Sequence, residues 1–239
     1  MDANYSTLFL IFFIYAVIGY IVETISVSVI EKELIFSRGF LIGPYLPLFG
    51  FGGLFMTIAL WKYRNDLVAL FIMSMALCLV LEYLSSYILE KIFKLRWWDY
   101  SEKRFNLNGR VCLEVGLMFG FSGILLVKFI NPFIFKIFML ISPKVLVFIS
   151  IFLTIILLTD VYLSTKTILK LEKNFVRYTN DTSLEMKALI IEDLSKNSFF
   201  IKRLLSAFPS ADNKLSQFRE LKILIYEKIM RKKLKKENK

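Results

Sequence analysis

The sequence falls into five apolar blocks of about twenty residues each, separated by short polar stretches. A helix of about 20 apolar residues is long enough to cross the hydrocarbon core of a bilayer. Of all residues, 56% are hydrophobic, whereas a soluble domain is usually about 45 to 50% apolar. The sequence lacks the alternation of polar and apolar residues that is typical of membrane β-barrels. The pattern predicts an all-α, polytopic membrane protein with transmembrane helices near 7–30, 43–61, 66–90, 112–130 and 145–165.

The second block begins in a stretch rich in glycine and proline, between Arg38 and Gly53. Proline lacks a backbone N–H and glycine permits unusual conformations, so we expect a broken or re-entrant second span. Irregular backbone at membrane depth is tolerated where it is buried in protein or lines a watery cavity, as in the broken helices of transporters. A kinked helix with a glycine packing face is the alternative. The residues of the expected helix break are Gly39, Gly43, Pro44, Pro47 and Gly50.

The segment 131–143 is apolar but short, and it contains Pro132 and Pro143 near its two ends. This length is too small for a transmembrane helix. We therefore expect a short interfacial hairpin here, with Lys136 extending its ammonium group to the headgroups.

Ionisable residues lie inside and beside the apolar blocks. A charge at membrane depth costs roughly 2.5 to 3.5 kcal/mol, so it usually marks a function or a buried pair. In the predicted topology these residues share the cytoplasmic half of the membrane, where they either pair with one another or line a charged cavity. Glu90 and Lys91 resemble ordinary interface charges, and Asp160 is either a helix-end residue or a partner of the group. The candidate cavity residues are Glu23, Arg38, Glu82, Asp99, Tyr100, Asn106, Arg110 and Glu114.

The distribution of lysine and arginine predicts an outside N-terminus and a cytoplasmic C-terminus. This orientation places eight basic loop residues inside and five outside. The tail 166–239 holds 18 of the 31 basic residues and nine of the 20 acidic ones. We expect a transmembrane domain at 1–165 and a basic, amphipathic helical cytoplasmic tail at 166–239. The N-terminus lacks the basic region of a signal peptide, so we expect the first block to be a retained anchor.

The chain contains no histidine and only two cysteines, Cys78 and Cys112. The lack of histidine excludes histidine-ligated metal or haem sites and a Ser-His-Asp triad. We expect no cofactor, no metal site and no nucleic-acid partner, and we leave open whether the chain is an enzyme. No P-loop occurs in the sequence, so an ATPase would have to be a separate subunit.

Two motifs and two acidic positions form a recognisable set within residues 8–165. They are the run from Arg38 to Gly52, the run Trp97–Ser101 followed by Phe105–Leu113, Glu23, and Glu82 with Tyr83. The set resembles the hallmark segments of a bacterial family, the ABC-transporter type IV or CmpB-like permeases. The resemblance implies a multi-span, permease-like protein of the bacterial cytoplasmic membrane.

Three functions agree with these features. The first is a permease-like transport component with a charged, cytoplasm-facing cavity within the membrane. The second is an intramembrane lipid-binding protein, or an enzyme acting on an anionic lipid or isoprenoid phosphate. The third is a non-catalytic membrane protein whose tail docks a partner. Besides the lipid bilayer, the expected partners are a separate ATPase subunit, an anionic small molecule or lipid, and a second copy of the chain.

Overall fold

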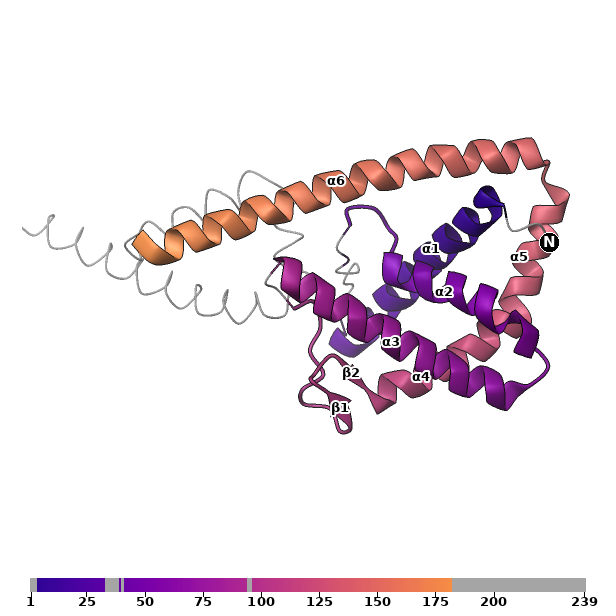
Figure 1. Cartoon of the computed structure of the whole chain (residues 1–239), viewed down its shortest axis with the longest axis horizontal. Coiled ribbons are helices and arrows are strands. Elements are labelled where there is room, and N and C mark those ends of the chain that lie inside the picture. The colour runs from indigo at the N-terminus through magenta and orange to yellow at the C-terminus, as the bar shows by residue number, and fades with distance from the viewer. Residues whose placement is uncertain (1–3, 33–38, 40, 94–95, 182–239) are drawn as a thin grey trace, which may run out of the picture.

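The computed structural model describes residues 4–32, 39, 41–93 and 96–181 (Figure 1). Arg38 and the tail beyond residue 181 therefore lie outside the described residues. The described part is built from helices and one two-stranded hairpin. In chain order, the elements are α1 (Tyr5–Glu31), α2 (Pro47–Leu60), the 3-10 turn η1 (Trp61–Tyr63), α3 (Leu67–Phe93), β1 (Asn106–Leu107), β2 (Val111–Cys112), α4 (Leu113–Leu125), the π-helical turn η2 (Leu126–Ile130), α5 (Asn131–Leu140) and α6 (Pro143–Asp181).

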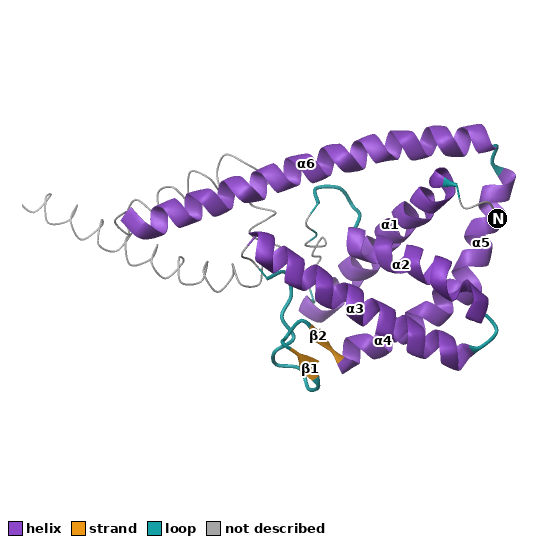
Figure 2. Cartoon of the chain, viewed as in Figure 1, coloured by secondary structure: helices purple, strands orange, loops and turns teal. Residues whose placement is uncertain are grey.

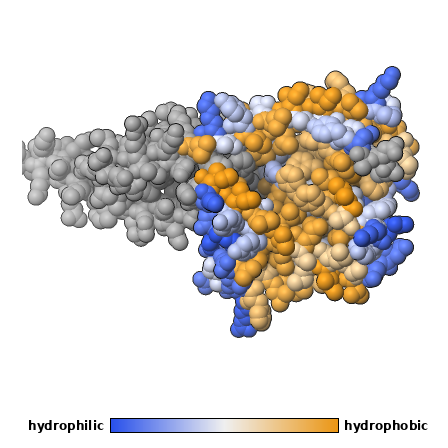
Figure 3. Space-filling model, viewed as in Figure 1, coloured by the Kyte–Doolittle hydropathy of each residue, from blue (hydrophilic) through white to orange (hydrophobic). Residues whose placement is uncertain are grey.

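Four helical runs are long and apolar enough to cross a membrane, which confirms the predicted class of polytopic helical membrane protein. Figure 3 shows apolar side chains over the middle of the molecule and hydrophilic side chains at its two ends. This distribution matches a bilayer core between two headgroup layers. The four runs are Tyr5–Val29, Leu67–Ile92, Leu113–Leu140 and Pro143–Thr167.

The second predicted span is shorter than expected, because α2 begins only at Pro47 and has 14 residues. At about 1.5 Å per residue it is roughly 21 Å long, less than the hydrocarbon thickness of about 30 Å. Its glycines allow a close approach to α1. A Cβ atom at Gly53 would overlap the ring of Tyr15, and one at Gly50 would lie 2.8 Å from Phe12. Gly50 and Gly53 therefore form a packing face toward α1, while the chain before Pro47 is irregular.

The interfacial hairpin expected at 131–143 is replaced by helix. Residues 131–140 form α5, which continues α4 through the π turn at 126–130 in one helical run of 28 residues. Pro132 is the second residue of α5 and directly follows the π turn, which accommodates the missing N–H without ending the helical run. A π turn is a common cause of a bend, and Figure 1 shows α5 leaving the direction of α4.

The elements that carry the predicted site residues meet at one end of the molecule. Figure 2 shows the β-hairpin beside the C-terminal end of α3, and the loop before α2 lies at this same end. The N-terminus and the connection between α5 and α6 lie at the opposite end (Figure 1). We call the first of these the hairpin end.

Candidate functional site

A compact loop between α3 and α4 forms the outer part of the site. Strands β1 and β2 pair antiparallel, with Asn106 opposite Cys112. Asn108 and Gly109 between the strands both have positive φ values, 54° and 66°, which a tight turn requires and which asparagine and glycine adopt most readily. The side chain of Asn106 braces the turn by accepting a hydrogen bond from the Gly109 N–H at 2.9 Å and donating to the Lys103 carbonyl at 2.8 Å.

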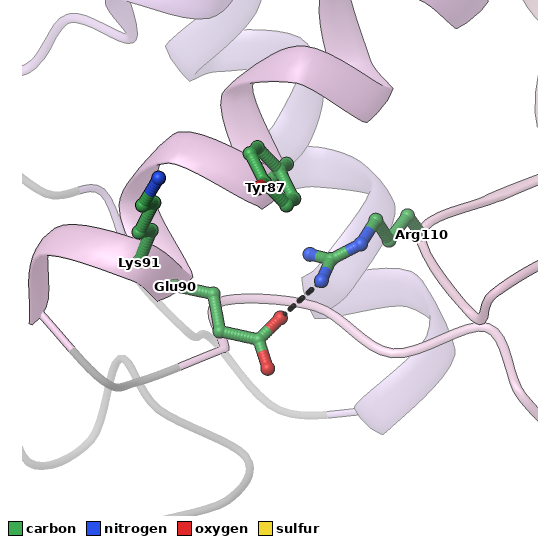
Figure 4. A pocket seen from close by; sticks show the side chains of 4 residues that line it. All are labelled: Tyr87, Glu90, Lys91 and Arg110. Atoms are coloured by element: carbon green, nitrogen blue, oxygen red, sulfur yellow. Dashed lines mark ion pairs between the residues drawn. The ribbon is translucent and has the colours of Figure 1, made fainter.

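Arg110 fastens this hairpin to the last turns of α3. Its guanidinium forms a 2.7 Å ion pair with Glu90 and donates to the Ser86 hydroxyl at 3.1 Å. The same group lies 5.8 Å from the ring centre of Tyr83 and 5.5 Å from that of Tyr87, within the range of cation–π attraction. Figure 4 shows Arg110 reaching from the hairpin toward Glu90. Arg110 is therefore a structural anchor of the hairpin as well as a charge.

The ion pair of Arg110 extends into a chain of charges. Glu90 also contacts the Arg96 guanidinium at 3.4 Å, and Arg96 contacts Asp99 at 3.3 Å. Asp99 is half exposed, and the hydrogen bond from Ser101 is the main cause that lowers its pKa below the usual aspartate value. Asp99 and Arg110, both predicted site residues, are thus joined through Glu90 and Arg96, which the sequence interpretation had left out of the site.

Glu82 forms the inner part of the site, and its surroundings differ from those of the charged residues Glu90 and Arg110. It lies within the apolar part of α3, and only 5% of its surface is exposed. The Tyr100 hydroxyl donates to Oε1 of Glu82 at 3.1 Å. The second oxygen, Oε2, is buried and has no hydrogen-bond partner among the described residues. Such an atom is unusual, because a buried polar group without a partner costs about 1–3 kcal/mol.

Glu23 lies close enough to this pair for its charge to act on Tyr100. Burial is the main cause that raises the pKa of the Tyr100 hydroxyl above its ordinary value, and the negative charge of Glu82 and then that of Glu23 add to it. The loop between α3 and α4 therefore supplies a tyrosine that bonds to Glu82 of α3 and experiences the charge of Glu23 of α1. We call Glu23, Glu82 and Tyr100 the acidic site.

Two further predicted residues, Glu114 and Asn106, have other partners. Glu114 is exposed and pairs with Lys103 at 2.8 Å, and the hydrogen bond that the Lys103 ammonium donates to Glu114 is the main cause that raises the pKa of Lys103. Asn106 serves the hairpin turn. Arg38 lies outside the described residues.

The sequence interpretation treated Asp160 as a helix-end residue or an outlying partner of the group. In the structure, the side chain of Asp160 fixes the loop before α2. Its carboxylate accepts hydrogen bonds from the backbone N–H groups of Ile42 at 2.9 Å and Gly43 at 2.7 Å. It also accepts from the hydroxyls of Tyr45 at 2.6 Å and Ser164 at 2.9 Å. The irregular backbone at the predicted break, which includes Gly43 and Pro44, is thus satisfied by protein groups from α6.

A second polar cluster, which the sequence interpretation missed, joins three helices. The Asn131 side chain on α5 is fully buried, and its oxygen accepts from the hydroxyls of Tyr15 at 2.7 Å and Thr57 at 3.1 Å. Its Nδ2 has no partner among the described residues. The only signal in the sequence was a lone asparagine within an apolar stretch.

The described residues can be assessed for a pocket and for a metal site. A shallow, open pocket of about 330 Å³ at the hairpin end is lined by Tyr87, Glu90, Lys91 and Arg110. Within the described part of the chain, no cluster of three or more histidine, cysteine or acidic residues could hold a metal ion. The site can therefore offer unpaired carboxylate oxygen at membrane depth and basic groups near the surface.

Comparison with known proteins gives one match. Residues 10–165 match the family described as "Putative ABC-transporter type IV". No curated protein and no solved structure matches the chain. The matched region contains the acidic site, the hairpin and Asp160, and it covers more than half of the 239 residues. The chain therefore belongs to this ABC-transporter-type family and is a multi-pass membrane protein.

Proposed function

We propose that the chain is a permease-like transport component and that the acidic site is where its cargo or a coupling ion binds. The observation that carries this proposal is the state of Glu82, a carboxylate buried in an apolar helix with one oxygen unpaired among the described residues. Burying a carboxylate without partners is expensive, so such a group is expected where something binds it during the working cycle.

The chemistry of the acidic site favours a positively charged ligand. Glu82 accepts a hydrogen bond from Tyr100 there, the charge of Glu23 acts on Tyr100, and the one described arginine predicted for the cavity, Arg110, is already paired with Glu90. Carboxylates that share a site bind a proton or another cation between them more readily than they remain doubly ionised. A proton, a monovalent metal ion or an amine meets this requirement. Arg38, which lies outside the described residues, stays a candidate residue.

The orientation proposed for the chain has its hairpin end in the bacterial cytoplasm. The basic residues of the loops support it, because lysine and arginine are enriched on the cytoplasmic side. In this orientation the acidic site opens toward the cytoplasm, and the N-terminus faces outward. The tail 166–239 then starts within α6, which continues past the apolar run to Asp181 on the cytoplasmic side.

A separate ATPase subunit is the partner that this function requires, since the chain has no P-loop of its own. We test this role by purifying the full chain from its own membranes in mild detergent. A stoichiometric partner should hydrolyse ATP, and Glu82→Gln should slow that hydrolysis at least severalfold. Glu114→Gln is the matched control, because Glu114 lies near the same end but is exposed and paired with Lys103. The proposed role would be contradicted if no ATPase co-purified, or if the rate of ATP hydrolysis were the same in wild type and in both variants.

The acidic site has a test of its own that needs no partner. A hydrophobic carbodiimide reacts with protonated carboxyl groups in apolar surroundings, and peptide mass spectrometry identifies the modified residue. We expect labelling at Glu82 but not at Glu90, because Glu90 is held by two arginines. Sodium or potassium ions should slow the labelling where such an ion is the ligand, and acidification should speed it where the ligand is a proton. Equal reaction at Glu82 and Glu90 would remove the site assignment.

A further inference from the structure

The open pocket at the hairpin end carries more positive than negative charge. Lys91 and Arg110 line it together with a single carboxylate, that of Glu90. Glu90 is already shared between Arg110 at 2.7 Å and Arg96 at 3.4 Å. Its negative charge is therefore divided between two guanidinium groups, and none of it is committed to Lys91.

Lys91 is the basic group of the pocket that remains available. It is exposed, and its ammonium lies 5.9 Å from the ring centre of Tyr87. Among the described residues, no carboxylate forms an ion pair with it. Figure 4 shows Lys91 and Arg110 on opposite sides of Tyr87, from two different segments of the chain. The pocket thus offers two cationic groups around an aromatic ring.

The depth of the pocket points to the membrane surface. Lys91 lies at the end of the apolar run Leu67–Ile92, where a transmembrane helix enters the headgroup layer. Below it on α3, Tyr87, Leu84 and Val80 recur at intervals of three and four residues, so they share one face of the helix. All three are exposed, between 47% and 57%. This face is an apolar stripe that leads from the membrane interior to the pocket.

We propose that this pocket binds the headgroup phosphate of an anionic phospholipid from the adjacent leaflet. Lys91 and Arg110 hold the phosphate, Tyr87 borders the glycerol region, and the acyl chains lie along Leu84 and Val80. The charge surplus selects an anionic headgroup over a zwitterionic one. This site is separate from the acidic site and does not depend on the proposed transport role.

Native mass spectrometry of the full chain in detergent tests the assignment, with phosphatidylglycerol and phosphatidylcholine added in turn. We expect one retained phosphatidylglycerol per chain and weaker retention of phosphatidylcholine. Lys91→Gln should weaken phosphatidylglycerol binding roughly fivefold, the effect of one basic residue at a membrane surface. Arg110→Lys, which keeps the charge but loses the forked geometry, should weaken it as well.

Lys166→Gln is the matched control for Lys91→Gln. Lys166 is also exposed, lies at the end of an apolar run and sits 5.6 Å from a tyrosine ring, that of Tyr162. It is not among the residues that line the pocket with Arg110, so its loss should leave lipid retention unchanged. Equal losses in the two lysine variants would overturn the proposal, because they would show only a general attraction of basic residues for anionic lipid. Inorganic phosphate that displaces the lipid at millimolar concentration would also overturn it, since the pocket would then bind free phosphate.

Discussion

Asp160 and Glu82 are both carboxylates inside apolar helices, but their oxygens are satisfied to very different degrees. Asp160 accepts hydrogen bonds from two backbone N–H groups and two hydroxyls. Glu82 accepts from Tyr100, and its other oxygen has no partner among the described residues. A fully bonded carboxylate stabilises structure, whereas a half-bonded one retains the capacity to bind. This contrast separates a structural acid from a candidate functional one.

Replacing Asp160 should therefore destabilise the protein. Asp160→Asn removes the charge that strengthens the hydrogen bonds from Ile42 and Gly43, and we expect a loss on the order of 2 kcal/mol. Thermal unfolding can be followed with a thiol-reactive dye, because Cys78 and Cys112 are both free and buried. Thr159→Ala is the control, since among the described residues the Thr159 hydroxyl bonds only to Ile155 of its own helix, and this variant should unfold at nearly the wild-type temperature.

Removing the hydroxyl of Tyr100 should have an effect that depends on pH. Tyr100→Phe leaves buried Glu82 without its donor, which should cost about 1–3 kcal/mol at neutral pH. The pKa of Tyr100 is raised in the folded protein, chiefly by burial and then by the charge of Glu82. A group whose pKa is higher in the folded than in the unfolded chain stabilises the fold in full at pH values below its unfolded pKa, which is about 10 for tyrosine. This stabilisation is lost as the pH rises from the unfolded pKa toward the folded one.

The measurement is the difference in stability between wild type and Tyr100→Phe across a pH series. We expect a constant difference up to about pH 10, followed by a decrease of about 1.4 kcal/mol per pH unit. A difference that stays constant above pH 10 would mean that Tyr100 ionises equally in the folded and unfolded chain.

Residue types at membrane depth were predictable from the sequence, but most of their partners were not. The embedded acids and Arg110 stand out because charge is rare in apolar blocks. The pairing of Arg110 with Glu90 depends on how the hairpin folds back onto α3, which no spacing in the sequence reveals. One signal was available, since Glu82, Ser86 and Glu90 recur every four residues and so share a face of α3.

At the scale of elements, the hairpin is held by its turn as much as by its ion pairs. Gly109 has a φ of 66° and is packed so closely that a Cβ atom would collide with the side chains of Asp99 and Ser101. The turn therefore requires glycine for both conformation and space. Because the indole N–H of Trp98 donates to the Arg110 carbonyl at 2.9 Å, distortion of the turn should disturb Trp98 as well.

Gly109→Ala should loosen the hairpin. The left-handed conformation alone costs about 1–2 kcal/mol for a non-glycine residue, and the collision adds to it. We expect a lower unfolding temperature and a red shift of tryptophan fluorescence as Trp98 becomes more exposed. Gly52→Ala is a matched control, because a Cβ at Gly52 would meet only the Cys78 sulfur, at an ordinary 3.6 Å. That variant should be as stable as wild type or slightly more stable, since alanine favours helix.

Element boundaries were predictable where apolar length decided them and less so where proline did. The first predicted span, 7–30, agrees closely with α1 at Tyr5–Glu31. The predicted start of the second span, residue 43, is too early. The backbone N–H groups of Ile42 and Gly43 bond to Asp160, more than a hundred residues away, and the sequence does not reveal this contact. The hairpin expected at 131–143 is helix because the π turn before Pro132 accommodates the proline without ending the run.

At the scale of the whole molecule, the two hydrophilic ends can be assigned to membrane sides by labelling (Figure 3). We expect Lys103→Cys, in the loop before β1, to react with a membrane-impermeant maleimide only in inverted vesicles. Asn65→Cys, in the loop between α2 and α3 at the other end, should react only in intact, cell-wall-free cells. Cys78 and Cys112 are buried and should give no background. The reverse pattern would invert the proposed orientation.

The continuity of α6 gives the molecule a mechanical property. The helix runs for 39 residues, about 58 Å, from the end of the bundle opposite the hairpin end to Asp181. Asp160 is tied to the loop before α2, and roughly 30 Å of the same rod extends beyond it. A rod pivoting at Asp160 by only about 5° moves its far end by roughly 3 Å. A force applied to the projecting part of α6 therefore acts as torque on the 41–45 loop, and movement of that loop is amplified in return.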